Sequence, residues 1–363
     1  MRYTRVQLDA VGYELAPNVV SSSELEGRLG PVYARLGLQV GQLEQFTGIR
    51  ERRWWDPGFR LSEGAARAAK RALEGSRVRP SDIGLLVYGG VCRESYEPAT
   101  ACAVAEALGV GGNAAIFDLS NACLGALNGI IDAANRIELG QIRAALVVSC
   151  ESARDINEAT IERMLGDGGI TGFKDSLATL TGGSGAVALL LTDGSFGSAG
   201  HRLLGGVHYA APEHHRICRW GLEPAELKVM AGSPHPNPLP QAGEGVYREV
   251  MRTDAVAVLK HGITLGKRSW DAFLAELGWT GEQVDRSICH QVGSGHQREI
   301  LRAFGLPPEK DFTTYEYLGN MGTVALPVTA AIASERGVLR AGERVAFLGI
   351  GSGLNTIMLG WRW

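Results

Sequence analysis

Apolar positions in the first half of the chain form short continuous runs that alternate with stretches of helical periodicity. Continuous apolar runs of four to eight residues are typical of buried strands, and apolar residues spaced three and four apart are typical of helices. This pattern predicts strands at Tyr3–Val11, from Asp82 to Gly89, and at Ala114–Leu119, Ala144–Ser149 and Gly185–Thr192, and helices from Ser22 or Ser23, at Ser62–Glu74, at Thr100–Leu108 and directly after Cys123.

The second half of the chain repeats this succession. The same pattern predicts strands at Arg286–Cys289, Phe312–Tyr315, Val345–Leu348 and Asn355–Trp361, and helices at Gln297–Phe304 and Thr323–Arg336. Strands that alternate with helices predict an α/β protein with a largely parallel core. Because the order of elements occurs twice, we also predict an internal duplication, with one half at residues 1–193 and the other at residues 194–363.

The composition narrows the class of protein. Of the 363 residues, 45% are hydrophobic and 21% are charged, which excludes disorder of the whole chain. Thirty-six basic and thirty-nine acidic residues give a net charge of −3, so we expect no nucleic-acid binding. No apolar stretch resembling a signal peptide follows Met1, and no run reaches the roughly 18 residues of a transmembrane helix. We therefore expect a cytoplasmic enzyme without integral membrane association.

Residues 233–245 differ from the rest of the chain, because they hold four of its fourteen prolines within seven residues. Proline at every second position is incompatible with a helix or a paired strand, which predicts an extended surface insertion at about residues 232–245. A proline-rich motif for a partner and a tolerated insertion without function are both compatible with this composition.

The six cysteines are scattered without a C-x-x-C pair, which is typical of reduced thiols. Cys123 differs from the others because it lies where a predicted strand ends and a helix begins. Backbone N–H groups and the helix dipole lower the pKa of a thiol at such a position. The small neighbours Ala122 and Gly125 would allow a substrate to approach closely. A nucleophile and an ordinary buried thiol both remain open here.

Three segments near the carboxyl terminus carry further candidate chemistry. His290 ends a predicted strand before a glycine-rich stretch, which fits either a site histidine or a structural one. Asn320 lies between two glycines, where asparagine is common in turns, but its side-chain NH₂ can also donate to a developing oxyanion. The loop Gly349–Gly353 is not a dinucleotide-binding fingerprint, because no helix and no acidic residue follow it. We expect instead that its backbone N–H groups face the nucleophile. The motifs H-E-x-x-H, C-x-x-C and G-x-S-x-G are absent, and we expect no metal and no cofactor.

Taken together, these segments resemble the ketoacyl synthase III group of the thiolase superfamily. The matching segments are T-G-I-R-E-R-R-W from Thr47 to Trp54, D-L-S-N-A-C from Asp118 to Cys123, Cys289-His290-Gln291, Gly319-Asn320 and the terminal G-I-G-S-G loop. The resemblance covers the chain apart from the proline-rich insertion. It implies a thiolase-like fold, in which duplicated βαβαβ-type halves form a layered α-β-α-β-α core.

Within the superfamily, the resemblance is not equal for all members. Degradative thiolases carry a second cysteine in the terminal glycine loop, which is missing here. Ketoacyl synthases III that start fatty acid synthesis show the motifs W-x-x-x-R-T-G-I and H-Q-A-N. In this chain Gln42 and Phe46 replace the tryptophan and the arginine of the first motif, and the second motif reads H-Q-V-G. The closer resemblance is to the OleA-type condensing enzymes of long-chain olefin biosynthesis, which share a Y-x-E-P-type segment, here at Tyr96–Thr100, and the ending G-I-G-S-G-L-N, here at Gly349–Asn355.

This resemblance implies an acyltransferase that joins two fatty acyl-CoA molecules head to head. The reaction is a non-decarboxylative Claisen condensation that passes through an acyl group on Cys123 and gives a 2-alkyl-3-ketoacyl-CoA. The backbone N–H groups of Cys123 and Ser352 would hold the oxyanion of acyl transfer, and His290 and Asn320 would hold the enolate oxygen.

The resemblance also implies a homodimer, in which Glu97 reaches across the interface into the partner's site and serves as the base. A surface carboxylate that caps the helix near Thr100 is the alternative for Glu97. Three other activities stay open: decarboxylative condensation of an acyl-CoA with a malonyl thioester, an aldol addition of the hydroxymethylglutaryl-CoA synthase type, and acyl binding without turnover.

Overall fold

The computed structural model describes residues 1–363 except for residues 168, 198–199 and 225–246. The proline-rich insertion predicted at about residues 232–245 therefore lies outside the described residues.

The first half of the chain builds five strands of a mixed sheet. Their order is β5-β4-β6-β7-β1; β5, β4 and β6 are parallel, and β7 is antiparallel to both of its neighbours. The strands are β1 (Gln7–Leu15), β4 (Ile83–Gly89), β5 (Ala115–Leu119), β6 (Ala144–Glu151) and β7 (Gly185–Thr192). Four of them lie at or within two residues of their predicted bounds, whereas β1 begins four residues later than predicted.

The second half repeats this arrangement with one parallel strand fewer. The order is β11-β12-β13-β8; β11 and β12 are parallel, and β13 is antiparallel to both of its neighbours. The strands are β8 (His201–Ala210), β11 (Arg286–Cys289), β12 (Arg344–Gly351) and β13 (Asn355–Arg362). Two residue pairs between β1 and β8 join the halves into one nine-stranded sheet. The repeated strand pattern confirms the predicted duplication. It also supports the division at residue 193, which stays a proposal.

The strand predicted at Phe312–Tyr315 is wrong. Only one parallel bridge forms there, between Ser287 and Asp311, and the short helix α11 (Tyr315–Leu318) begins at the end of the predicted strand. The carboxylate of Asp311 accepts hydrogen bonds from the hydroxyl of Ser287 at 2.9 Å and from the backbone N–H of Cys289 at 3.2 Å. A side chain therefore fixes this segment against β11, where the first half of the chain has a strand.

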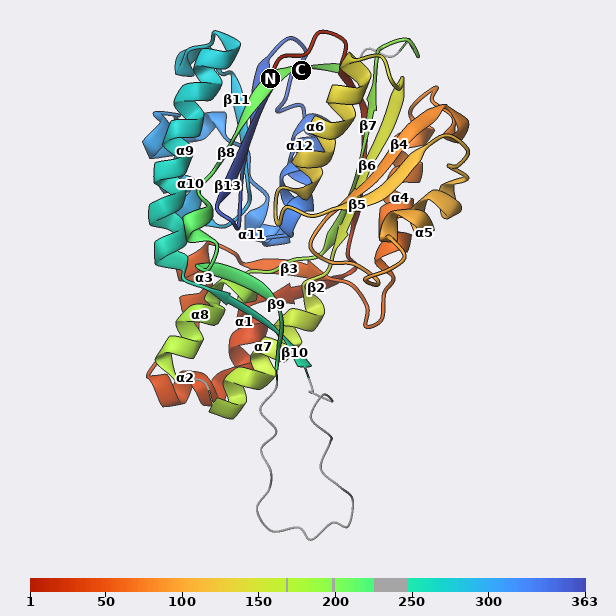
Figure 1. The fold of residues 1–363 in the computed structure, drawn as a ribbon. Coiled ribbons are helices and arrows are strands. Elements are labelled where there is room, and N and C mark those ends of the chain that lie inside the picture. The colour runs from red at the N-terminus through yellow and green to blue at the C-terminus, as the bar shows by residue number, and fades with distance from the viewer. Residues whose placement is uncertain (168, 198–199, 225–246) are drawn as a thin grey trace, which may run out of the picture.

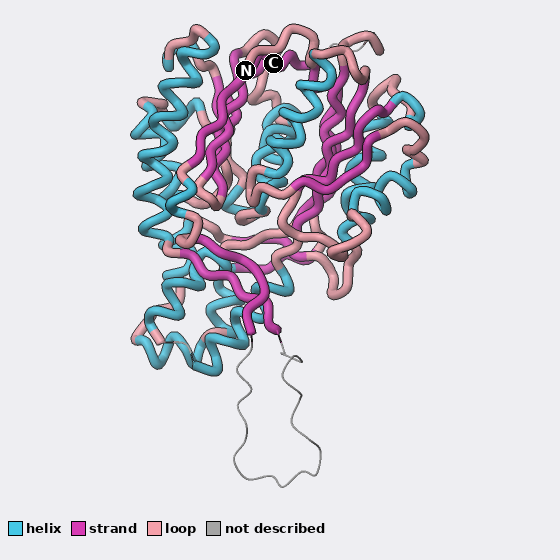
Figure 2. Tube along the Cα trace, viewed as in Figure 1, coloured by secondary structure: helices cyan, strands magenta, loops and turns pink. Residues whose placement is uncertain are grey.

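Helices cover both faces of the strands and fill the space between the two halves (Figures 1 and 2). The first outer layer packs on β4, β6 and β7, the central layer lies between the two halves, and the second outer layer packs on β12 and β13. The first outer layer consists of α4 (Leu61–Glu74) and α5 (Thr100–Leu108). The central layer consists of α6 (Gly125–Glu138) and α12 (Ala325–Glu335). The second outer layer consists of α9 (Ala255–Leu277) and α10 (Ser294–Phe304). The predicted α-β-α-β-α layering is confirmed.

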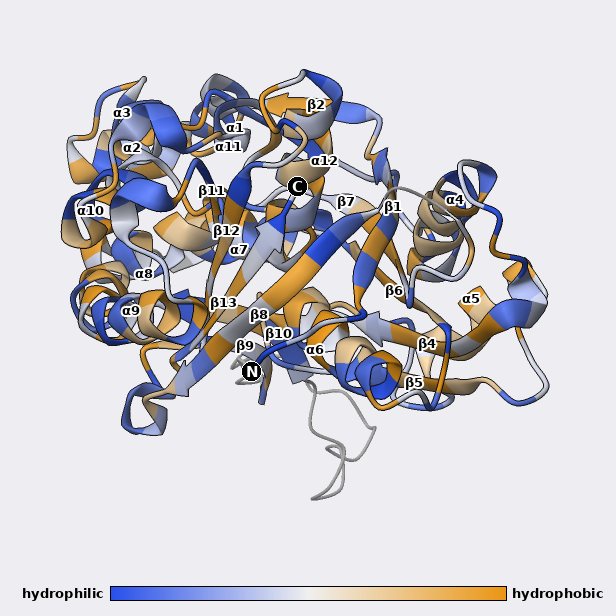
Figure 3. Cartoon of the chain, turned by 90° about the horizontal axis from the view of Figure 1, so that it is seen from above, coloured by the Kyte–Doolittle hydropathy of each residue, from blue (hydrophilic) through white to orange (hydrophobic). Residues whose placement is uncertain are grey.

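The hydropathy of the chain explains this layering. Apolar residues concentrate on the strands and on the helix faces toward them, while hydrophilic residues gather on the outside (Figure 3). The central helices α6 and α12 are buried over most of their length, because the two halves of the sheet cover them on two sides. No helix of the described residues is long and apolar enough to cross a membrane.

A group of smaller elements lies at one end of the layers, below the sheets in Figure 1. Five of its helices share one apolar cluster. The elements are β2 (Asn18–Ser21), α1 (Ser22–Arg28), α2 (Gly30–Leu36), α3 (Gln42–Thr47), β3 (Glu51–Trp54), α7 (Arg154–Asp167), α8 (Ile170–Leu180), β9 (Cys218–Pro224) and β10 (Tyr247–Thr253). Of these, the sequence predicts only α1, whose N-cap Ser21 accepts a hydrogen bond from the backbone N–H of Glu24 at 3.0 Å. This group and the ends of the sheets enclose the cavity described next.

Candidate active site

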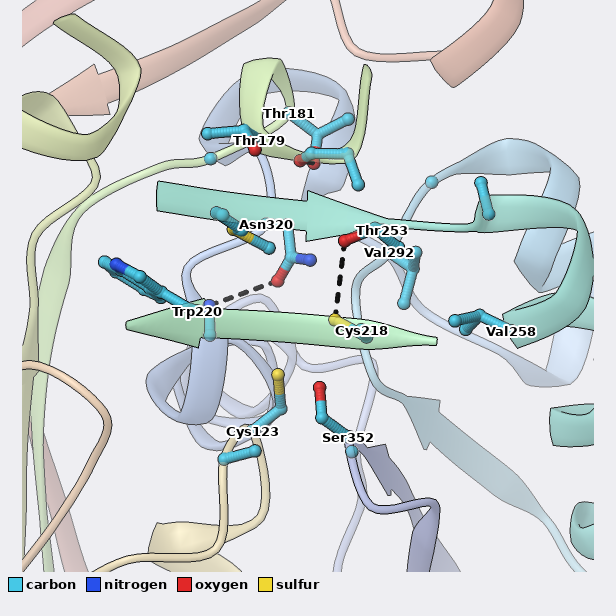
Figure 4. A pocket seen from close by; sticks show the side chains of 18 of the residues that line it. Cys123, Thr179, Thr181, Cys218, Trp220, Thr253, Val258, Val292, Asn320 and Ser352 are labelled. Carbon is cyan, nitrogen blue, oxygen red and sulfur yellow. Dashed lines mark hydrogen bonds between the residues drawn. The ribbon is translucent and has the colours of Figure 1, made fainter. Parts of the chain in front are cut away.

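A cavity of about 580 Å³ lies where the two halves meet the group of smaller elements. Four of the residues predicted to carry chemistry line it: Cys123, His290, Asn320 and Ser352. Figure 4 shows the side chains of Cys123, Asn320 and Ser352 directed toward a common space. The rest of the lining is mostly apolar and includes Ile156, Leu177, Trp220, Met251, Val258 and Leu354. The cavity therefore suits a long apolar substrate whose reactive end meets a few polar groups.

Cys123 lies in a sharp turn between β5, which ends at Leu119, and α6, which begins at Gly125. The turn is made at Ala122, which has a φ of 47°, in the left-handed region that costs a non-glycine residue on the order of 1–3 kcal/mol. Asn121 holds the turn, because its Oδ1 accepts a hydrogen bond from Asn355 Nδ2 at 3.0 Å. The strained turn places the sulfur of Cys123 at the cavity.

Gly125 has a different role from the one predicted. A Cβ at Gly125 would lie 2.8 Å from the backbone of Gly89 and Gly90, and a Cβ at Gly89 would lie 2.6 Å from Gly125. The glycine therefore lets helix α6 approach strand β4 closely, and it does not make room for a substrate. This contact fixes the start of α6, and with it the position of Cys123.

The prediction of a lowered pKa for Cys123 is wrong. Burial raises its pKa to about 12, and the charges of Cys218 and Glu151 act in the same direction. Removal from water therefore outweighs the effect of the helix start in the empty cavity. The thiol of the free protein carries its proton at neutral pH.

His290 directly follows strand β11, and its backbone N–H and its carbonyl are both hydrogen-bonded. Its backbone N–H donates to Leu348 O at 3.0 Å, and its carbonyl accepts from Val292 N at 3.0 Å. The next residue, Gln291, is buried and accepts hydrogen bonds from the backbone N–H groups of Thr314 and Tyr315. Burial lowers the pKa of His290 to about 4, with a contribution from His296, so the imidazole is neutral at pH 7.

Asn320 is oriented by its own loop. Its Oδ1 accepts a hydrogen bond from Gly322 N at 3.1 Å, which leaves the NH₂ group to face the cavity (Figure 4). Its backbone N–H donates to Thr181 O at 2.9 Å. The preceding Gly319 has a φ of 68°, and a Cβ there would lie 2.8 Å from the Cβ of the buried Arg52. The T-G-I-x-x-R segment thus supports the loop that carries Asn320.

Ser352 lies beside Cys123 in the terminal glycine loop. A Cβ at Gly351 would lie 3.4 Å from the backbone nitrogen of Cys123, so this loop passes directly over the nucleophile. The close approach agrees with the predicted position of the loop.

Glu97 is not part of this cavity. It lies in the loop of residues 90–99 between β4 and α5, and its side chain is exposed, as is that of Tyr96, which is 90% exposed. It does not cap α5 either, because the carboxylate of Asp118 accepts the backbone N–H groups of Thr100 and Ala101, both at 2.9 Å. The structure therefore removes the helix-capping alternative and leaves the tip of this loop outside its own site.

Glu151 lines the cavity, although the sequence analysis does not single it out. It is the last residue of β6, in which every residue is buried. A carboxylate at the end of an otherwise buried strand is the signal that a sequence offers for such a residue. Among the described residues, no three His, Cys, Asp or Glu side chains come together as they would around a metal ion.

The chain is similar over its whole length to proteins named acyl-CoA:acyl-CoA alkyltransferases. Residues 58–167 match the thiolase N-terminal domain, and residues 274–363 match the 3-oxoacyl-[acyl-carrier-protein] synthase III C-terminal domain. The chain is 54% identical to an acyl-CoA:acyl-CoA alkyltransferase of Shewanella oneidensis, with 100% of both chains covered. It is 34% identical to the protein of that name from Xanthomonas campestris pv. campestris, with 99% of this chain and 98% of the relative covered.

The chain belongs to the acyl-CoA:acyl-CoA alkyltransferase family. Solved structures of Xanthomonas campestris OleA superpose on it with a TM-score of 0.89, at 34% identity, covering 100% of this chain and 98% of that one. A structure of the same protein with bound lauric acid and lauroyl-CoA gives a TM-score of 0.88, covering 99% and 100% of the two chains. The thiolase-like fold and the relationship to OleA are confirmed.

Proposed function

We propose that this alkyltransferase joins two fatty acyl-CoA molecules by a non-decarboxylative, head-to-head Claisen condensation. The observation that carries this function is the meeting of Cys123, His290 and Asn320 in one largely apolar cavity. Acyl-CoA is the substrate, and the lauroyl-CoA bound to the related OleA supports this substrate class. We also predict that the enzyme works without a cofactor and in the cytoplasm.

In the first step, the sulfur of Cys123 attacks the thioester carbonyl of one acyl-CoA. The bond from the carbonyl carbon to the CoA sulfur breaks, and the thiol proton leaves with CoA. Because the pKa of the Cys123 thiol is about 12 in the free protein, deprotonation accompanies substrate binding and attack. The backbone N–H groups of Cys123 and Ser352 stabilise the oxyanion of this step.

In the second step, the α-carbon of another acyl-CoA loses a proton. The α-proton of a thioester is weakly acidic, so the step needs a base and donors for the enolate oxygen. The neutral imidazole of His290 and the NH₂ group of Asn320 supply the donors, and Glu97 of the other subunit of a homodimer accepts the proton. The enolate carbon then attacks the acyl group on Cys123, the thioester bond to Cys123 breaks, and a 2-alkyl-3-ketoacyl-CoA results.

The position of Glu97 supports its action across an interface. The side chain is exposed and is not among the residues that line the cavity of its own chain. A homodimer that inserts the tip of this loop into the partner's cavity gives each site a carboxylate.

Substitution of Glu97 tests this assignment. Glu97→Gln keeps the size of the side chain but removes the proton acceptor, so acylation of Cys123 should persist while condensation falls by about 10²-fold or more. CoA release from the first acyl-CoA measures acylation, and mass spectrometry measures the coupled product. Full condensing activity of Glu97→Gln, with CO₂ released from malonyl-CoA, would instead support the decarboxylative alternative.

A mixed dimer tests the exchange of Glu97 between subunits. Glu97→Gln and Cys123→Ala chains with different affinity tags are co-expressed, and dimers that carry both tags are isolated. One site then pairs an intact Cys123 with an intact Glu97 from the other chain, and about half of the activity of the unchanged dimer should return. Mixed dimers as inactive as both parents would show that Glu97 does not act across the interface.

A further inference from the structure

Glu151 lies between two loops that the proposed reaction requires. It ends strand β6 beneath the start of the loop of residues 90–99, which carries Glu97, and beside the loop that carries Asn320. A Cβ at Gly90 would lie 3.1 Å from Oε1 of Glu151, and a Cβ at Gly322 would lie 3.4 Å from its Cδ. The side chain is 3% exposed, and within the described residues it is the only carboxylate that lines the cavity.

Both oxygens of Glu151 bind the loop of residues 90–99. Oε1 accepts a hydrogen bond from Val91 N at 3.0 Å, and Oε2 accepts one from Cys92 N at 3.1 Å. Burial raises the pKa of Glu151 above its usual value, and hydrogen bonds from Cys92, Val91 and Thr323 offset only part of this rise. Two backbone N–H groups that hold one buried carboxylate form a charge-assisted pair of hydrogen bonds, which is stronger than two neutral ones.

The same loop is also fixed at Glu94 and at its far end. The carboxylate of Glu94 accepts hydrogen bonds from the backbone N–H and the hydroxyl of Ser62, at 2.8 and 2.6 Å. At the far end, Asp118 holds the first two residues of α5, as described above. Only residues 95–98 extend beyond these attachments, and all four are exposed. The direction in which Glu97 leaves the surface is thus set by these attachments, and at Cys92 Glu151 acts together with the hydroxyl of Tyr88, which donates to Cys92 O at 2.9 Å.

We infer that Glu151 is a positioning residue for the condensation step, which orients Glu97 for the partner's site by holding Val91 and Cys92. This role rests on the proposed function of Glu97. Each oxygen of Glu151 accepts a backbone hydrogen bond from the loop, which fits a role in holding the loop. Its effect therefore appears in the site of the other subunit, and not in the cavity that it lines.

The first test separates the two half-reactions. In Glu151→Gln the side-chain NH₂ cannot accept a hydrogen bond, so one of the two loop contacts is lost and Glu97 is held less firmly. Acylation of Cys123 should not fall, because loss of the Glu151 charge removes one cause of the raised pKa of Cys123, while condensation falls by about tenfold to 10²-fold, the scale for misplacing a reacting group by about 1 Å. Glu151→Asp keeps two acceptor oxygens and should recover part of the loss. Unchanged condensation, or an equal loss in both half-reactions, would overturn the inference.

Glu138→Gln is a matched control for this substitution. Glu138 also accepts two backbone N–H groups, those of Thr4 and Arg5 at 2.9 and 3.0 Å, but it lies outside the cavity lining. The same chemical change there should leave both half-reactions unaltered. If Glu138→Gln lowered condensation as Glu151→Gln does, the effect would be one of general stability.

Mixed dimers show in which site Glu151 acts. If Glu151 acts through the Glu97 of its own chain, Glu151→Gln should complement Cys123→Ala, because the working site receives an unaltered loop. It should not complement Glu97→Gln, because every site then lacks either the base or its support. The reverse pattern would place the effect of Glu151 in its own cavity, and failure to complement either variant would indicate a general structural role; each result would overturn the inference.

A double substitution separates this inference from the proposed exchange of Glu97. If Glu97→Gln and Cys123→Ala fail to complement each other, the action of Glu97 across the interface is wrong, whatever Glu151 does. In that case, a double variant that carries Glu97→Gln and Glu151→Gln in one chain should condense as fast as Glu97→Gln alone, because Glu151 acts only through Glu97. A further loss in the double variant would overturn the inference independently of the dimer. If Glu151→Gln yields no folded dimer, Glu151→Asp takes its place in each of these combinations.

Discussion

The sulfur of Cys123 is the reactive atom of the site, and its protonation is set by burial. With a pKa of about 12, only on the order of one thiol in 10⁵ is ionised at pH 7. The rate of alkylation by iodoacetamide in the free protein should therefore rise about tenfold per pH unit from pH 7 to pH 10. Peptide mass spectrometry at Cys123 measures this rate. A rate that levels off below pH 9 would mean that the helix start, and not burial, controls the thiol.

The donors of His290 and Asn320 are assigned to the enolate and not to acyl transfer. Replacement of either residue by alanine should therefore slow condensation by about 10²-fold, the scale for losing one preorganised donor. Acylation of Cys123 should lose less, because the backbone N–H groups of Cys123 and Ser352 serve that step. Single-turnover measurements of both half-reactions make the comparison, and equal losses would indicate that the two residues only maintain the shape of the cavity.

Of the residues in this site, those with local signals could be predicted and those defined by distant contacts could not. Cys123, His290, Asn320 and Ser352 stand in short motifs, and the structure brings them to one cavity. Glu151 has no such motif, because its partners are backbone N–H groups about sixty residues away in the chain. The pKa of Cys123 could not be predicted either, since burial depends on the packing of the whole cavity.

At the scale of elements, the turn before Asn320 depends on a glycine that has no room for a side chain. Gly319 has a φ of 68°, and a Cβ there would lie 2.6 Å from Thr181 O. Gly337 has a φ of 67° but open space around it. Gly337→Ala should cost only the strain of the left-handed region, about 1–2 kcal/mol. Gly319→Ala should destabilise more and also slow condensation by at least about tenfold, because the loop must shift with Asn320.

Thermal unfolding and single-turnover condensation of the two alanine variants measure this difference. Equal stability and equal condensation rates would show that the crowding at Gly319 has no consequence for Asn320.

Two elements show why sequence patterns fail at this scale. Helix α9 is missing from the predicted elements, because Gly262 and Gly266 interrupt its helical pattern. In the structure, Ile350 packs against Gly262 and Phe304 packs against Gly266, in the space that a side chain would fill. The strand predicted at Phe312–Tyr315 has the right position in the duplicated order, but the side chain of Asp311 takes over its pairing. In both cases a long-range contact decides what the local pattern leaves open.

At the scale of the whole molecule, the duplication brings the parts of the site together. Cys123 follows strand β5 of the first half, and His290 follows strand β11 of the second half, so the two halves each contribute a chemical group to one cavity. The order of elements predicts mixed α/β layers and a duplication, because each half alternates strands and helices, whereas the α-β-α-β-α layering is implied by the family resemblance. The group of smaller elements that closes the cavity has no counterpart in that repeat and could not be predicted from it. It consists of β2, α1, α2, α3, β3, α7, α8, β9 and β10.

Incubation with myristoyl-CoA as the only substrate is the most direct test of the central claim, that the enzyme condenses two acyl-CoA molecules without a malonyl donor. We predict that one CoA is released for each condensation and that mass spectrometry detects the coupled 2-alkyl-3-ketoacyl-CoA or the ketone derived from it. Cys123→Ala should give neither product. A coupled product that forms only when malonyl-CoA is added, with release of CO₂, would contradict the claim.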